Sequence, residues 1–129
     1  MPKLLIPPVT TSKLIDVFVP DSSSTVGAGL TGLVFNTANL VAYYYREGEA
    51  APVKIARGGA TALVTMTLGT WVSCGWVAID GTNMPGWYQL GVPNAAFAAG
   101  ANSVSIVPRG ATNMGPCNVE IQLSSAPAD

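Results

Sequence analysis

Hydrophobic and polar residues alternate along most of this chain, with the period of two that places one side of a β-strand against a core. The clearest segments are SKLIDVFVP (12–20), LVAYYYRE (40–47) and NVEIQL (118–123). In the last of these, Val119, Ile121 and Leu123 share one face and polar residues occupy the other. This is the pattern of a half-buried strand in an antiparallel sheet. The alternation predicts a chain built mainly of β-strands.

Further strands are predicted in the second half of the chain. VKIARGGATALVTMTL (53–68) predicts two strands joined as a hairpin at Gly58–Gly59, and Trp76–Asp80 predicts another. PNAAFAAG (93–100) predicts a single helical turn, with Asn94 as a possible cap and glycine to stop it. The Gly- and Ser-rich stretch at 21–32 lacks the lysine and helix start of a phosphate-binding loop, so it predicts an ordinary loop.

Roughly seven to nine short strands, one helical turn and no alternation of strands with helices favour an all-β fold. The expected architecture is an immunoglobulin-like antiparallel β-sandwich, and a β-barrel is the alternative. We expect the sandwich to occupy residues 12–124, between an extended N-terminal arm (1–11) and a C-terminal tail (125–129).

The N-terminal arm, MPKLLIPPVTT, carries three prolines that remove backbone donors and favour an extended conformation. Such an arm docks either on another subunit or on the sheet of its own domain, and the sequence leaves both outcomes open. We expect deletion of residues 2–11 to leave the fold intact and to weaken assembly, whereas a sharp drop in thermal stability would show that the arm belongs to its own core. The predicted partner-contact residues are Leu4, Leu5, Ile6, Pro7 and Pro8.

Composition favours a protein whose surface is covered by other protein. Charged residues make up 10% of the 129 residues, whereas about a quarter is usual. Hydrophobic residues make up 49%. A surface so poor in charge promotes association, although a soluble monomer covered in Ser and Thr stays an alternative. The net charge of −1 offers no basic surface for nucleic acid.

The hydrophobic runs are too short for a signal peptide or a membrane span, so we expect synthesis in a cytoplasm and no membrane partner. In a reducing compartment the two cysteines, Cys74 and Cys117, are expected to stay thiols, and a disulfide between them is the less favoured alternative.

Candidate catalytic chemistry is sparse. The chain has no histidine, which removes the usual general base and the commonest metal ligand. Asp80 and Glu120 are a conceivable carboxylate pair, but Asp80 lies in a turn sequence and Glu120 on the polar face of its strand. Cys74 has no neighbouring base or cation in sequence to activate it. We therefore expect no enzyme activity, no cofactor, no metal and no small-molecule substrate.

The aromatic residues suggest a second kind of function. Trp71, Trp76, Trp87 and the tyrosines at 43–45 could stack against sugar rings in a carbohydrate- or receptor-binding module. That alternative predicts that Trp71, Trp87 or Tyr44 are exposed together on one face. Aromatic residues in alternating strands are more often part of the core, and we expect at least one tryptophan there.

Four stretches carry a resemblance to a known kind of protein: PDSSSTVGAGLTGLVFNTANLVAYYYREG, MTLGTW, AIDGTNMPGWYQLGVPNAAFAAGANSV and GATNMGPCNVEIQL. Together they span about residues 15–123 and resemble a small structural module of tailed-bacteriophage and prophage virion proteins. The resemblance implies a bacteriophage virion structural protein, assembled in the host cytoplasm. The expected role is a capsid decoration or cement subunit, and a tail adaptor, fibre or baseplate component is the alternative. The partners it implies are other virion proteins (major capsid or tail proteins) and copies of the chain itself.

The same resemblance implies a structural role for NMPGWYQLGVPNAAFAAG (83–100). In such modules Pro85–Gly86 make a turn, Tyr88 and Leu90 enter the core, and residues 93–100 cross between the sheets.

Overall fold

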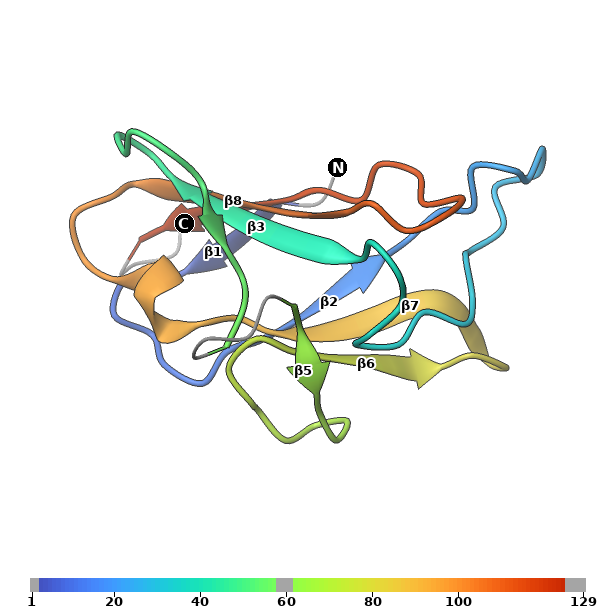
Figure 1. The fold of residues 1–129 in the computed structure, drawn as a ribbon. Coiled ribbons are helices and arrows are strands. Elements are labelled where there is room, and N and C mark those ends of the chain that lie inside the picture. The colour runs from blue at the N-terminus through green and yellow to red at the C-terminus, as the bar shows by residue number, and fades with distance from the viewer. Residues whose placement is uncertain (1–2, 58–61, 125–129) are drawn as a thin grey trace.

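Two β-sheets packed face to face form the structure, a computed structural model that describes residues 3–57 and 62–124 (Figure 1). The five-stranded sheet has the order β1-β9-β8-β3-β4 and the four-stranded sheet the order β2-β7-β6-β5. The strands of the larger sheet are β1 (Lys3–Ile6), β9 (Val119–Leu123), β8 (Ser103–Arg109), β3 (Val41–Arg46) and β4 (Val53–Lys54). Those of the smaller sheet are β2 (Leu14–Phe18), β7 (Met84–Gly91), β6 (Gly75–Asp80) and β5 (Val64–Thr65).

The predicted all-β sandwich is confirmed, and the described strands do not close into a barrel. The neighbours β9-β8-β3-β4 in one sheet and β2-β7-β6 in the other match the strand order of a variable-type immunoglobulin domain. The strand pairs are antiparallel except for β1 with β9 and β5 with β6, which are parallel. The two parallel pairs in this mainly antiparallel sandwich are therefore at β1 and β5, each the edge strand of its sheet.

The core lies between the sheets and is built from the alternating residues that the sequence indicated. Ile15 and Val17 of β2 are each 2% exposed, and Ile121 of β9 is fully buried. Trp76 stacks on Tyr88 at a centroid distance of 5.0 Å, which confirms that at least one tryptophan belongs to the core. Each such side chain contributes about 1.5–3 kcal/mol through its burial.

The N-terminal arm contributes a strand to its own domain. Lys3–Ile6 runs parallel to β9, with Leu4 opposite Ile121 and Ile6 opposite Leu123. Ile6 is only 4% exposed because it fills the end of the core. Of the two outcomes that the sequence left open, the structure has the arm on its own sheet. The predicted C-terminal tail, 125–129, lies outside the described residues.

The predicted hairpin over 53–68 is wrong. β4 pairs with β3 in the larger sheet, whereas β5 pairs with β6 in the smaller one. The segment crosses between the sheets because Ile55 and Leu63, which are both buried, anchor it on either side. The proposed turn, Gly58–Gly59, lies outside the described residues.

The corner element at 83–100 is confirmed in part. Pro85 and Gly86 lie within β7 and do not form its turn. The turn instead lies between β6 and β7, where Asp80 Oδ1 accepts hydrogen bonds from the backbone amides of Thr82 (2.9 Å) and Asn83 (3.0 Å). Gly86 has a φ of 88° and packs against the backbone of another segment, so this strand position requires glycine.

The single helical turn is present as the 3₁₀ helix η1 (Asn94–Phe97), which joins β7 of one sheet to β8 of the other. Tyr88 and Leu90 enter the core as expected. Asn94 does not cap the helix. Its Oδ1 accepts a hydrogen bond from the backbone amide of Ser12 (2.8 Å), which ties η1 to the start of β2.

Candidate functional site

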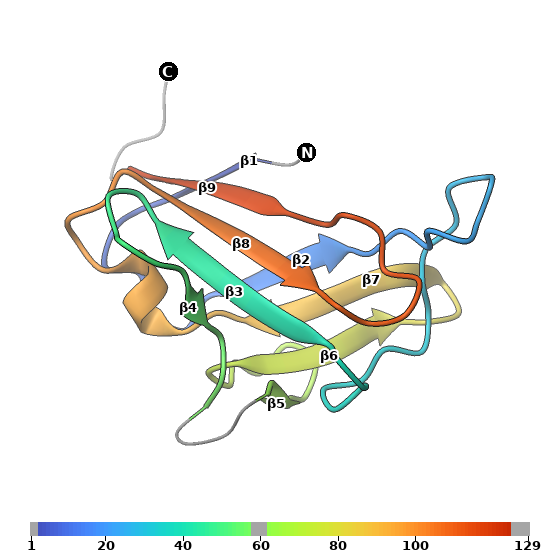
Figure 2. The same cartoon turned by 45° about the horizontal axis from the view of Figure 1, so that its top comes forward.

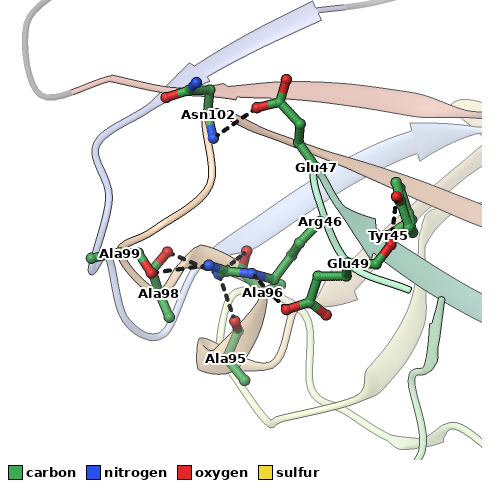
Figure 3. Close-up of polar contacts among 9 residues, drawn as sticks. All are labelled: Tyr45, Arg46, Glu47, Glu49, Ala95, Ala96, Ala98, Ala99 and Asn102. Carbon is green, nitrogen blue, oxygen red and sulfur yellow. Dashed lines mark hydrogen bonds and ion pairs between the residues drawn. The ribbon is translucent and has the colours of Figure 1, made fainter. Parts of the chain in front are cut away.

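Arg46 is the one buried charged side chain among the described residues. It lies at the end of β3, and its guanidinium points toward the labelled alanines of η1 and the residues after it, as Figure 3 shows. Its Nη1 donates to the carbonyl oxygens of Ala95 (3.0 Å), Ala96 (3.3 Å) and Ala98 (2.8 Å), and its Nη2 donates to that of Ala99 (3.1 Å). The guanidinium therefore bonds to carbonyl groups in η1 and in the two residues that follow it, of which that of Ala95 also accepts a hydrogen bond from the amide of Ala98 (3.4 Å).

Acidic and aromatic side chains surround Arg46 at the C-terminal end of β3. Glu49 Oε2 lies 3.8 Å from Arg46 Nε, and the Tyr45 hydroxyl donates to the backbone carbonyl of Glu49 (2.7 Å). Glu47 accepts a hydrogen bond from the amide of Asn102 (3.2 Å). Because backbone carbonyls occupy the guanidinium, we interpret Arg46 as a structural group that joins the two sheets. The burial of Arg46 could have been predicted from the alternation in β3, because Arg46 lies two residues after Tyr44 and four after Ala42 and therefore on the same buried face.

β1 and β2 are the outermost strands of their two sheets (Figure 2). A hollow of about 620 Å³ is lined by residues of these strands and of the segments next to them. One wall of the hollow is the face of the larger sheet that points toward the core. The other wall is the face of β2 and β7 that points away from the core. The lining residues are Leu4, Asp16, Phe18, Pro20, Trp87, Pro116, Cys117, Asn118 and Val119. We call this hollow the β2-edge groove.

Aromatic and apolar side chains dominate the β2-edge groove. Phe18 and Trp87 are neighbours across β2 and β7, with ring centroids 5.5 Å apart, and Trp87 is 38% exposed. Asp16 is the only charged residue among those that line the groove. Its Oδ1 accepts a hydrogen bond from Gln89 Nε2 (3.2 Å). The groove therefore offers an apolar, aromatic surface with a single negative charge.

A smaller hollow of about 300 Å³ lies beside the core tryptophan, Trp76. Its other walls are apolar apart from Thr65, and include Leu33, Phe35 and Met66. The Trp76 Nε1 atom is buried and has no hydrogen-bond partner among the described residues. That unpaired donor is a cost of placing a large aromatic residue here.

The two cysteines are free thiols, in agreement with the favoured prediction. Burial raises the pKa of the Cys117 thiol to about 11, and its Sγ lies 3.3 Å from the carbonyl oxygen of Pro108. Burial also raises the pKa of Cys74, against smaller opposing effects from Ser73 and the positive charge of Arg57. Neither environment favours the reactive thiolate.

The two candidate carboxylates occupy different sheets and different settings. Asp80 closes the β6–β7 turn, and hydrogen bonds from Asn83 and Thr82 hold the pKa of its carboxyl below the usual value. Glu120 lies on the exposed face of β9 in the other sheet. Among residues 3–57 and 62–124, no three Asp, Glu, Cys or His side chains gather as metal ligands would.

The aromatic residues singled out for sugar binding do not form a common exposed face. Tyr44 is only 6% exposed, and Trp76 is in the core. Trp71 is half-buried and its Nε1 donates to the carbonyl oxygen of Val92 (3.1 Å). Trp87 alone of the three tryptophans is exposed, and its aromatic neighbour is Phe18, a residue that the sequence did not single out.

The predicted partner-contact residues are divided by the pairing of β1 with β9. Ile6 is enclosed in the chain's own core, and Leu4 packs against that core while lining the β2-edge groove. Leu5 points outward and is 44% exposed. Pro7 is exposed and Pro8 half-buried. Only part of the predicted set is therefore available to another molecule in this arrangement.

Comparisons with protein-family models, with curated proteins and with solved structures give no match to this chain. In the part of the chain that the structure describes, no helix has the length and hydropathy needed to cross a membrane.

Proposed function

We propose that this chain is a structural protein of a bacteriophage particle, a decoration or cement subunit of the capsid that acts through protein–protein contacts. Its partners in this proposal are the major capsid protein and further copies of the chain. No catalytic step is part of the role.

The observation that carries the proposal is the presence of exposed apolar side chains on both outer faces of the sandwich. Leu5 (44% exposed) and Tyr45 (39%) point outward from the larger sheet, and Trp87 (38%) points outward from the smaller one. A subunit that is packed between neighbours needs such contacts on more than one side. Charged residues, which would keep free monomers apart, make up only 10% of the chain.

The bonding of Arg46 supports the same role in another way. A decoration subunit must keep its shape while many copies each make weak contacts, because symmetry then multiplies every contact. The buried guanidinium joins β3 of one sheet to the segment that follows η1, which comes from the other. It thereby restrains the two sheets relative to each other.

The test is to locate the chain in purified particles of a phage that encodes it. Mass spectrometry counts its copies, and image reconstruction of particles carrying a tagged chain gives its position. Copies on the order of hundreds per particle, arranged over the shell, are expected for a capsid subunit. About a dozen copies or fewer, at the tail, would replace the capsid role by a tail role. Absence from purified particles would refute a virion role altogether.

Substitutions separate the apolar surface from the fold. Leu5→Lys, Tyr45→Lys and Trp87→Lys each place a charge on an outer face, and Thr31→Lys in an exposed loop is the matched control. We expect the three variants to melt close to the wild type and to incorporate poorly, while the control incorporates normally. Normal incorporation of all three would show that these faces do not make the contacts.

A further inference from the structure

The edge of β2 that faces away from β7 has unpaired backbone groups. The Lys13 carbonyl oxygen accepts a hydrogen bond from the amide of Val92, the residue after β7 (3.2 Å), and the Val19 amide donates to the Gly86 carbonyl of β7 (2.8 Å). The odd-numbered residues of β2 therefore face β7. The amides and carbonyls of Asp16 and Phe18 therefore point to the open side. They have no hydrogen-bond partner among the described residues.

The open stretch has a defined length. Beyond Phe18, the Pro20 carbonyl accepts a hydrogen bond from the amide of Gly115 (2.8 Å), and the amide of Ser22 donates to the Asn113 carbonyl (2.8 Å). The segment before β9 thus closes that end of the edge. What remains is β2 itself, five residues long, which an extended chain spans in about 17 Å.

The β2-edge groove lies against this open stretch. Asp16 and Phe18 belong both to the edge and to the groove lining, and Leu4 and Val119 of the larger sheet form the opposite wall. The Asp16 Oδ1 atom is bonded to a neutral glutamine, and Oδ2 has no partner among the described residues. The surface therefore combines free backbone groups, an apolar wall and one uncompensated negative charge.

We propose that the β2 edge binds an extended segment of another polypeptide as an additional β-strand of the smaller sheet. Residues opposite each other on paired strands share a face. The bound segment therefore places a lysine or arginine opposite Asp16 and an apolar or aromatic residue opposite Phe18. The residue between these two points toward Leu4 and Val119, so it is apolar as well. Main-chain hydrogen bonds supply affinity and the side chains supply specificity.

A sugar is the other class of ligand that an aromatic groove with a carboxylate can bind. It would stack on Trp87 and leave the backbone of β2 unpaired. The unpaired amides and carbonyls favour the peptide, because only another extended backbone matches their spacing. This inference does not rest on the proposed place in a virion, so its failure would leave the incorporation experiments unaffected.

The test uses a synthetic peptide with the core Phe-Val-Lys-Val-Phe, flanked by threonines. The core reads the same in both directions, so it fits parallel or antiparallel pairing. One control peptide has glutamate in place of lysine. A second carries methyl groups on the backbone nitrogens of all five core residues, because the Lys and Phe nitrogens would bond to β2 in antiparallel pairing and the Val nitrogens in parallel pairing. Calorimetry gives the affinities, and amide hydrogen exchange by NMR shows where each peptide binds.

We expect the lysine peptide to bind and to slow amide exchange at Asp16 and Phe18. The glutamate and methylated peptides are expected to bind at least about tenfold more weakly. Asp16→Asn reduces the preference for lysine over glutamate to about twofold or less. Glu120→Gln, which neutralises an exposed carboxylate on the outer face of β9, leaves that preference unchanged.

Several results would overturn the proposal. They are no measurable binding of the lysine peptide, binding without protection of the two amides, or equal binding of the methylated peptide. A neutral glucan oligosaccharide is titrated in parallel. If it quenches tryptophan fluorescence in the wild type but not in Trp87→Phe, the groove is a sugar site and the peptide proposal is wrong.

Discussion

Replacing Arg46 by methionine tests whether the buried guanidinium holds the two sheets together. Methionine keeps an unbranched apolar stem and removes every donor. Three of the four carbonyls bonded to Arg46, those of Ala95, Ala98 and Ala99, are partly buried, so water can reach them after the substitution. The Ala96 carbonyl is buried and would be left with no hydrogen-bond partner among the described residues.

The magnitude follows from this division. A buried acceptor left unsatisfied costs about 1–3 kcal/mol, and a hydrogen bond to a charged group contributes about 1.5–3 kcal/mol. The contributions are not additive, because Nη1 carries two hydrogens and faces three acceptors. We therefore expect Arg46→Met to lower the free energy of unfolding by about 3 kcal/mol. Arg46→Lys keeps the charge but not the fork of donors, so about half of the loss is expected.

Urea denaturation followed by tryptophan fluorescence measures both variants. Arg109→Met is the matched control, since Arg109 is exposed at the end of β8. Its expected effect is within about 0.5 kcal/mol of zero. If Arg46→Met unfolds at the same urea concentration as the control, the hydrogen bonds to the η1 segment do not stabilise the fold and the reasoning is wrong. An Arg46→Lys variant as stable as the wild type would show that charge alone suffices.

Three further predictions use the same assay. Deleting residues 2–7 should lower the free energy of unfolding by about 2–4 kcal/mol, because β1 buries apolar surface on its own sheet. An unchanged free energy of unfolding would mean that the arm does not pack on its own domain. Gly29→Ala should cost more than about 2 kcal/mol, since its Cβ would overlap the carbonyl oxygen of Pro85, whereas Gly81→Ala meets open space and should be nearly neutral. The raised pKa of Cys117, about 11 against 9.0 for an ordinary thiol, means that the folded state holds the proton more tightly. The contribution of the Cys117 thiol to the free energy of unfolding is therefore complete below about pH 9 and is lost as the pH rises toward about 11. Over this range the wild type should lose about 1–2 kcal/mol more than Cys117→Ala. Parallel pH profiles of the two proteins would contradict this.

The features of the fold that the sequence predicted are those set by local pattern. Period-two alternation identified β2, β3 and β9 because each of these strands buries one face along its whole length. The aspartate and glycine at 80–81 marked the β6–β7 turn, since an aspartate side chain bonds to amides two and three residues ahead. These patterns involve only a few neighbouring residues, so they can be recognised without knowing which strand pairs with which.

Strand pairing was less predictable, because it depends on residues far apart in the chain. β4 and β5 are two residues each, too short for their alternation to show which sheet they join. The glycines between them indicated a hairpin, but burial of Ile55 and Leu63 sends the chain from one sheet to the other. Pro85 and Gly86 likewise suggested a turn, although proline is compatible with a strand position where no hydrogen bond is required.

The same distinction applies to the β2-edge groove. In the sequence Asp16 and Phe18 are simply the outward members of an alternating strand, no different from Tyr43 and Tyr45 in β3. The difference comes from topology, because β3 has hydrogen-bonded neighbours on both sides whereas β2 has one. The arm sharpens this difference, since it extends the larger sheet by pairing with β9 and leaves β2 uncovered. An open edge beside an apolar wall is a hazard for aggregation unless something occupies or protects it. The single charge at Asp16 is the only such protection within the groove lining, and it also selects for a basic partner.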